Sequence, residues 1–376
     1  MPRAGKRAAT SEIRADASRR KTSHTPPASP EDIPVAAKSE PEEPLDKYGD
    51  LILRVGPGRK SYRVCSRTLA RASPVFDAML YGPSADPRPL ADQWTINLPD
   101  DGLAETSFFL SISHGQSASV PSALPISALC KLLHLLEKYD AMPVIRPWIQ
   151  GWLKHVGGNT KDLRLLWISW TAGDSNMFRT VFEKVAESQS IDQDGNLEYD
   201  DATLKLFPND GSSMGSPTAL LGSFTFWTAA EITEAIIGTR KALVDAQLDP
   251  YWKIIDQIER GKAYAGDCGA SVVGSLAMCF VRGGLGTITA LKTSVSSYRG
   301  TVDNLAVTLK SKVPSQVSEH CYSCRRYWNR VDKPLPVYPE GGIISESHQD
   351  RLNARAAETD LVRTERDFWS TWAAAA

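Results

Sequence analysis

The chain has 376 residues, 42% of them hydrophobic, and carries 43 Lys and Arg against 44 Asp and Glu. This length allows a sizeable buried core in roughly two to three domains, and the balanced charge excludes a chain-wide basic surface for nucleic acid or membrane. Six cysteines are too few for a disulfide framework, and no run of about 18 apolar residues is present, so we expect an intracellular protein without a membrane span.

The first part of the chain, residues 1–46, is rich in Pro, Ser, Ala and charge and has few large apolar side chains, which predicts a disordered tail. Its basic residues form two short clusters, Lys6-Arg7 and Arg19-Arg20-Lys21. Acidic residues follow at Glu31, Asp32, Glu40, Glu42 and Glu43. Two basic clusters separated by a spacer are typical of a bipartite nuclear import signal, and a solubilising tail is the alternative interpretation. The expected location is the nucleus, the cytoplasm or both.

A β-hairpin is predicted next, with strands over residues 50–56 and 60–65 joined by the turn Pro57-Gly58. A short helix over residues 67–72 follows, for which Ser66 is placed as the N-cap.

A second short helix is predicted to begin at Pro74. Ser73 suits its N-cap because a serine hydroxyl accepts a helix N–H, and proline suits the first helical position because no N–H is needed there. The chain therefore bends at Ser73 and does not continue as one long helix.

One more strand and three more helices are predicted up to residue 156. The strand spans residues 93–98, with Trp94, Ile96 and Leu98 on one face. A helix over 103–113 ends at His114-Gly115. The helix within 126–141 has its apolar face at Leu129, Leu132, Leu133, Leu136 and Tyr139. The last one, within 142–156, has Ile145, Trp148, Ile149 and Trp152 on one side, and Pro147 either resets its start or kinks it.

This order of elements resembles the BTB/POZ domain, in the form common in fungal proteins. The residues that carry the resemblance are Gly49-Asp50-Leu51-Ile52-Leu53, Tyr62-Arg63-Val64, Leu69, Ser73-Pro74-Val75-Phe76, Met79-Leu80, Ile96 to Asp101, His114-Gly115, Leu136-Glu137-Lys138-Tyr139-Asp140 and Arg146-Pro147-Trp148. The resemblance implies an α+β BTB/POZ domain over residues 47–156, with a short sheet flanked by helices. It also implies that Phe76, Met79 and Leu80 face the core and that the domain binds proteins without catalysis.

Three features of the sequence depart from that family pattern. Cys65-Ser66 stands where many animal members carry a histidine, and residues 30–46 are too Pro-rich and acidic for the extra helix that those members exchange between protomers. Thr106 replaces a bulky apolar residue, which predicts a looser contact beneath its helix.

Residues 157–331 are predicted to be mostly helical, with successive apolar faces and with Asp249-Pro250 as the cap and start of one helix. This region resembles the helical part that follows the BTB domain in the fungal proteins, through ISWTAGDSNMF, EAIIGTRKALVDAQLDPYWKIIDQ and YRGTVDNLAVTLKS. Residues 332–376 begin with a Pro/Gly-rich linker and continue as a polar, partly helical tail. Near its end this tail carries Phe368, Trp369 and Trp372, and the tail is expected to dock on the body or on a partner.

Two segments are similar to chemical motifs but lack their context. Residues 190–201 overlay a calcium-binding EF-hand loop at Asp192, Asp194 and Gly195, yet Ser190 and Asp201 replace the terminal carboxylates, so a solvated acidic turn is the preferred interpretation. Ser213 stands in a G-x-S-x-G match that follows Pro208-Asn209-Asp210 and therefore lacks the strand-to-helix elbow of a hydrolase.

One cluster has the side chains of a zinc site. His320, Cys321 and Cys324 supply three ligands, and Cys268 is a candidate for the fourth. No second Cys-x-x-Cys is present, and a pair of reduced thiols in a loop is the alternative, so no cofactor is assigned.

The sequence therefore predicts a non-enzymatic protein–protein interaction module or scaffold. The partners implied by the resemblance are a second copy of the chain, a cullin-type ubiquitin ligase scaffold, for which the chain would be an adaptor, or a nuclear regulator. Direct contact with nucleic acid or membrane is not expected. The competing interpretation is a hydrolase that uses Ser213, or a metal-dependent one at Cys321 and Cys324.

Overall fold

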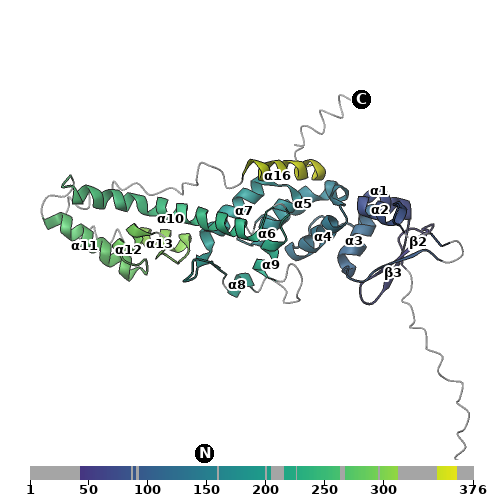
Figure 1. Cartoon of the computed structure of the whole chain (residues 1–376), viewed down its shortest axis with the longest axis horizontal. Coiled ribbons are helices and arrows are strands. Elements are labelled where there is room, and N and C mark those ends of the chain that lie inside the picture. Colours follow the sequence, from purple (N-terminus) through teal and green to yellow (C-terminus); the bar gives the residue numbers. More distant parts are fainter. Residues whose placement is uncertain are drawn as a thin grey trace, which may run out of the picture. The chain divides into compact units, whose positions relative to one another are not determined.

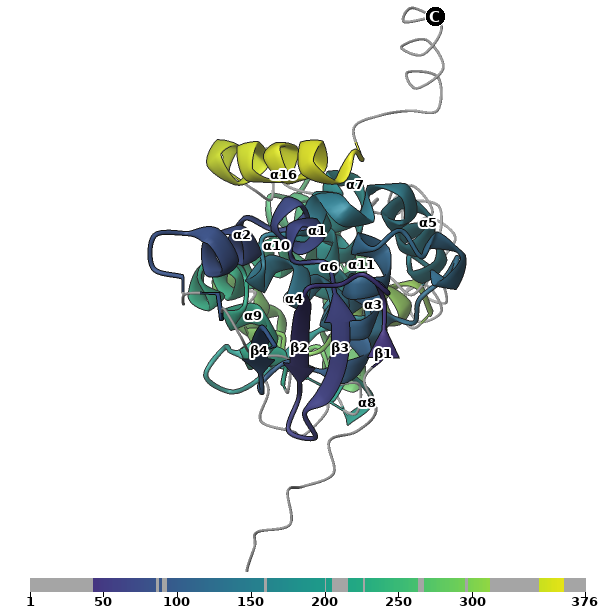
Figure 2. The same cartoon turned by 90° about the vertical axis from the view of Figure 1, so that its right-hand side faces the viewer.

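The computed structural model describes residues 43–85, 88–89, 93–158, 161–199, 201–204, 216–225, 227–262, 267–294, 297–311 and 345–361. The described residues are mostly helical, with a small mixed sheet near the N-terminal end (Figures 1 and 2), which confirms the expected α+β character. In these residues no helix is long and apolar enough to cross a membrane.

The sheet contains the predicted hairpin, β2 (Leu51–Val55) and β3 (Lys60–Val64), together with β4 (Thr95–Leu98) and the two-residue β1 (Glu43–Pro44). The strand order is β1-β3-β2-β4, as Figure 2 shows. β2 pairs antiparallel with β3 and parallel with β4. β3 therefore returns the chain to the end of the sheet at which β4 begins, and the connection from β3 to β4 passes β2 and contains two helices. β1 lies within the segment assigned above to the N-terminal tail, so the sheet begins before residue 47.

The helix pair between those strands is α1 (Ser66–Ala72) and α2 (Pro74–Tyr81). Ser73 caps α2 as predicted, with its Oγ accepting the Phe76 N–H at 3.0 Å. The prediction for Ser66 was wrong. Ser66 is the first residue of α1. Its hydroxyl donates to the Asp50 carboxylate at 2.8 Å, and its backbone N–H donates to the same carboxylate, so the side chain does not cap the helix.

The core face of α2 differs in one residue from the expectation. Phe76 and Leu80 are buried, at 1% and 4% exposure, but Met79 is 36% exposed. At about 100° per residue, Leu80 lies roughly 40° from Phe76 around the helix and Met79 roughly 60° on the other side. Met79 therefore sits at the edge of the buried face.

The remaining elements up to residue 156 follow the predicted order. They are α3 (Leu103–Ser113), η1 (Ser117–Ser119), α4 (Ile126–Lys138), η2 (Met142–Ile145) and α5 (Arg146–Val156). Pro147 resets the helix start, since the 3-10 turn η2 ends just before α5 begins. Thr106 is buried, and its hydroxyl has no hydrogen-bond partner among the described residues. The looser contact expected there stays a prediction.

The helical region that follows contains α6 (Arg164–Ala172), α7 (Ser175–Ser188), β5 (Ser190–Ile191), β6 (Leu197–Glu198), α8 (Asp201–Leu204), α9 (Pro217–Gly222), α10 (Ala229–Glu259), α11 (Asp267–Arg282), α12 (Ile288–Thr293) and α13 (Val302–Ser311). All residues from 165 to 172 are buried, so α6 is enclosed on every side and not on one apolar face alone.

Helix α10 corrects the expected break at Asp249-Pro250. It runs through Pro250 without interruption, and Asp249 pairs with Lys253 at 2.6 Å inside the helix. A proline inside a helix removes one hydrogen bond and crowds the preceding turn. The helix continues because the residues on both sides of Pro250 bury one continuous apolar face: Leu243, Val244, Leu248, Tyr251, Ile254 and Ile255.

The polar tail contains one described helix, α16 (Glu346–Thr359), which packs against α5, α6, α7 and η2 (Figure 1). Docking on the body is therefore confirmed for this part of the tail. The hydrophobic core forms one cluster that includes Leu51 in β2 and Leu352 in α16. Because core contacts cross residue 156, the boundary placed there by the sequence stays a prediction.

Candidate interaction sites

A hollow of about 320 Å³ lies between α3 and α4 and is called the α3–α4 hollow below. Its lining residues are Ala104, Glu105, Phe108, Leu124, Ser127, Ala128, Lys131 and Leu132. The Phe108 ring packs on Trp152, with 5.8 Å between ring centres, and Trp152 donates its indole N–H to the Pro121 carbonyl at 2.9 Å. These contacts hold the aromatic wall in one position, so the hollow is preformed.

The rim of the α3–α4 hollow carries one acid, Glu105, and one base, Lys131. Beyond Lys131 on the exposed side of α4 lies His134. Partial shielding of its ring from water, followed by the nearby Lys138, lowers its pKa, and Glu105 acts in the opposite direction. The arrangement offers apolar contact at its floor and opposite charges at its edge. It can hold an apolar side chain of a protein partner that is flanked by charged residues.

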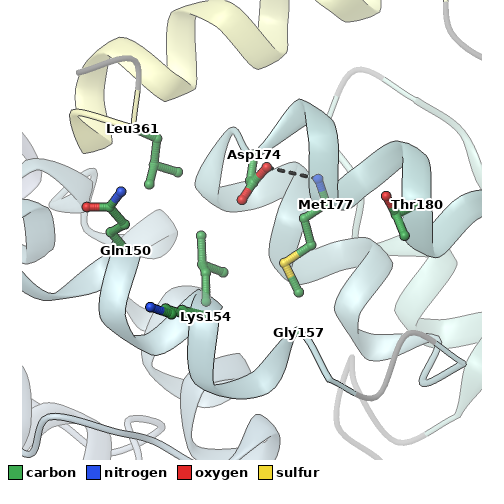
Figure 3. A pocket seen from close by; sticks show the side chains of 8 residues that line it. Gln150, Lys154, Gly157, Asp174, Met177, Thr180 and Leu361 are labelled. Atoms are coloured by element: carbon green, nitrogen blue, oxygen red, sulfur yellow. Dashed lines mark hydrogen bonds between the residues drawn. The ribbon is translucent and has the colours of Figure 1, made fainter. Parts of the chain in front are cut away.

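A second hollow, of about 390 Å³, lies between α5 and the start of α7 and is called the α5–α7 hollow. Figure 3 shows it. Its lining residues are Gln150, Leu153, Lys154, Gly157, Asp174, Met177, Thr180 and Leu361. Asp174 is the N-cap of α7 and accepts the Met177 N–H at 2.9 Å, so this carboxylate is already engaged within the protein.

The position of Leu361 at this hollow follows from the end of α16. Asp360 adopts the left-handed conformation, with φ of 63°, and the Leu361 N–H donates to the Ala356 carbonyl at 3.0 Å. The Thr359 hydroxyl donates to the Ala172 carbonyl at 2.7 Å, next to the turn that starts α7. This helix end is therefore fixed to the connection between α6 and α7.

The zinc and hydrolase candidates are mostly outside the described residues, where Ser213, His320, Cys321 and Cys324 all lie. Cys268 is described, half-buried near the start of α11. Within the described ranges no group of three or more His, Cys, Asp or Glu is arranged to hold a metal ion. The zinc cluster and the role of Ser213 therefore stay predictions.

The calcium-like segment forms the small hairpin β5–β6. Its Asp192 carboxylate accepts backbone N–H groups of Asp194 at 2.8 Å and Asn196 at 2.9 Å. These hydrogen bonds, first that of Asn196, lower the pKa of Asp192. The preferred interpretation, an exposed acidic turn, agrees with this geometry.

Neither hollow was predicted from the sequence, because each is built from residues of two or three separate elements. One signal was present. Ser127, Lys131, His134 and Lys138 recur at helical spacing and mark the exposed side of α4, which leaves Ala128 and Leu132 beside the neighbouring helix.

A comparison of the whole sequence with models of known protein families finds no match, and a comparison with curated proteins finds none either. The fold and the two hollows are therefore the observations on which a function can be argued.

Proposed function

We propose that the chain is a non-enzymatic protein–protein interaction module in which residues 47–156 form a BTB/POZ-type domain. The element order supports this proposal, since the bent helix pair α1–α2 comes between β3 and β4 in the chain. The parallel pairing of β2 with β4 supports it as well. The observation that carries the interaction role is the preformed α3–α4 hollow, with its apolar floor and charged rim. Its occupant is a protein side chain from a second copy, a cullin-type scaffold or a nuclear regulator.

A substitution that fills the hollow tests the proposal. Ala104 is exposed in the first turn of α3 and lines the hollow, so Ala104→Trp occupies the space with little effect on the core. Ala357→Trp makes the same change at an exposed position of α16 and serves as the matched control. We expect the wild-type chain and the control to retain the same partner in affinity purification and sedimentation, and Ala104→Trp to bind it at least about tenfold more weakly.

Equal partner binding by all three proteins would exclude the α3–α4 hollow as the binding site. Labelling of Ser213 by a serine-reactive probe would instead favour the hydrolase interpretation.

We further propose that the two basic clusters of the N-terminal tail direct nuclear import. Changing Lys6, Arg7, Arg19, Arg20 and Lys21 together to Ala should move a fluorescent fusion of the chain out of the nucleus. An unchanged distribution leaves only the solubilising role.

A further inference from the structure

We propose that the C-terminal segment, residues 362–376, binds in the α5–α7 hollow of its own chain through Phe368, Trp369 or Trp372. The segment starts at the edge of this hollow, because the last described residue, Leu361, is one of its lining residues (Figure 3). The inference does not depend on the α3–α4 hollow or on the partner proposed for it.

The starting point of the segment is fixed by three hydrogen bonds. The backbone N–H groups of Asp360 and Leu361 both donate to the Ala356 carbonyl, and the Thr359 hydroxyl donates to Ala172. A Cβ on Gly173 would lie 2.3 Å from the Ala356 nitrogen, which shows how closely this end of α16 approaches the connection between α6 and α7. The segment therefore leaves the body beside Asp174 and Met177.

The chemistry of the hollow suits a large aromatic side chain. Leu153 is buried, and Met177 and Leu361 are half-buried, so all three keep apolar surface against the hollow. In Figure 3 the Met177 side chain extends from the start of α7 toward α5, with its sulfur toward the middle of the hollow. A methionine sulfur packs favourably beside an aromatic ring, and the ammonium group of a lysine such as Lys154 is attracted to the face of an indole.

The length of the segment is also suitable. Phe368, Trp369 and Trp372 follow Leu361 by seven, eight and eleven residues. Seven extended residues span at most about 25 Å, and connections of about four to six residues are the most common in compact domains. Binding within one chain also takes place at an effective concentration on the order of millimolar, so a contact with a dissociation constant below about 1 mM keeps the hollow mostly occupied.

Amide hydrogen exchange of the full chain tests the proposal. The triple variant Phe368→Ser, Trp369→Ser and Trp372→Ser should exchange at least about threefold faster than the wild type in peptides that cover residues 150–157 and 174–181. A synthetic peptide with the sequence of residues 362–376, added in millimolar amount, should restore the slow exchange in the variant. The same peptide with the three aromatic residues replaced by serine should not.

Two substitutions on the body locate the binding. Thr180→Trp fills the α5–α7 hollow from an exposed position and should abolish the protection by the peptide, whereas Ser127→Trp fills the α3–α4 hollow and should leave it unchanged. Identical exchange in the wild type and the triple variant would overturn the proposal. Protection by the peptide at elements other than α5 and α7 would overturn it as well.

Discussion

The backbone N–H of Cys65 donates a hydrogen bond to Nε2 of His114 across 3.0 Å. The other ring nitrogen, Nδ1, lies 2.9 Å from the Leu110 carbonyl oxygen. Because Nε2 accepts, the proton is on Nδ1, which donates to Leu110, and the imidazole is neutral. One side chain therefore joins the start of α1 to the end of α3, and it does so only in its uncharged form.

This bond predicts a loss of folding stability in mild acid. Burial lowers the pKa of His114 below its ordinary value of about 6.5, although the Leu110 carbonyl and Asp46 act in the opposite direction. A group with a lowered pKa contributes its full stability above the unfolded-state value, and this contribution is lost as the pH falls from about 6.5 through the folded-state pKa. We expect His114→Gln to lose less stability than the wild type between pH 7.5 and 5 in urea unfolding.

His155→Gln is the control for that experiment, since His155 is exposed at the end of α5. His134 also has a pKa lowered by burial, so part of the pH dependence should remain in His114→Gln. The same acid loss in His114→Gln as in the wild type would show that the hydrogen bond to Cys65 does not contribute.

Phe76 is predicted to support the sheet-bearing part of the fold. Its ring stacks on Tyr139, with 4.4 Å between ring centres, and it is 1% exposed. Phe76→Ala should cost about 3–5 kcal/mol, comparable with a domain's total margin of about 5–15 kcal/mol. Thermal unfolding should show a large fall in midpoint for Phe76→Ala and a small one for Met79→Ala. Similar midpoints for the two variants would mean that the core face of α2 is misplaced.

Gly173 is predicted to be essential for the docking of α16. It ends α6 with φ of 86°, and a Cβ there would collide with the Ala356 nitrogen at 2.3 Å. Gly195 has the same φ, but no described atom lies within 4 Å of the Cβ position. Gly195→Ala should therefore cost only the backbone strain of about 1–2 kcal/mol, and Gly173→Ala about 1–3 kcal/mol more.

Hydrogen exchange of the α16 amides separates these contributions. The amides should exchange faster in Gly173→Ala and at the wild-type rate in Gly195→Ala. Unchanged exchange in Gly173→Ala would show that α16 does not depend on this close approach.

Pro250 is predicted to weaken the helix that contains it. Proline inside a helix destabilises the folded state by about 3 kcal/mol, but it also restricts the unfolded chain, which favours folding by about 0.4–1 kcal/mol. Pro250→Ala should therefore stabilise the protein by about 2 kcal/mol. Pro147 lies in the first turn of α5, where proline is tolerated, so Pro147→Ala should bring no such gain. Chemical denaturation measures both, and a less stable Pro250→Ala would indicate a break in α10 at this position.

The sequence predicted best those features that depend on a few neighbouring residues. The cap at Ser73 and the helix end at His114-Gly115 follow from local hydrogen bonding and from a left-handed glycine, and the structure has both of them. The hydrophobic face of α4 was also predicted correctly, because helical periodicity is visible over three turns. For α5 the prediction was right in part: Ile149 and Trp152 are buried, but Trp148 is half-buried.

The features that depend on distant residues were missed. Pro250 favours a break locally, but the buried contacts on both sides of it outweigh that preference. Serine is a common N-cap residue, yet the Ser66 hydroxyl donates to Asp50, just before β2, and does not cap α1. Both hollows combine residues from separate helices, and the α5–α7 hollow needs Leu361, which lies far along the chain from Gln150. No local pattern contains that information.

The docking of α16 also sets an order of events during biosynthesis. Arg355 pairs with Glu137 across 218 residues, and the Thr359 hydroxyl bonds to Ala172 across 187 residues. At about 5–20 residues per second, a ribosome takes roughly 10–45 s to add the chain between the members of such a pair. During this interval the surfaces of η2, α5 and α6 that α16 later covers face solvent. Nascent chains, and chains that stop before residue 345, therefore present these surfaces to chaperones and proteases.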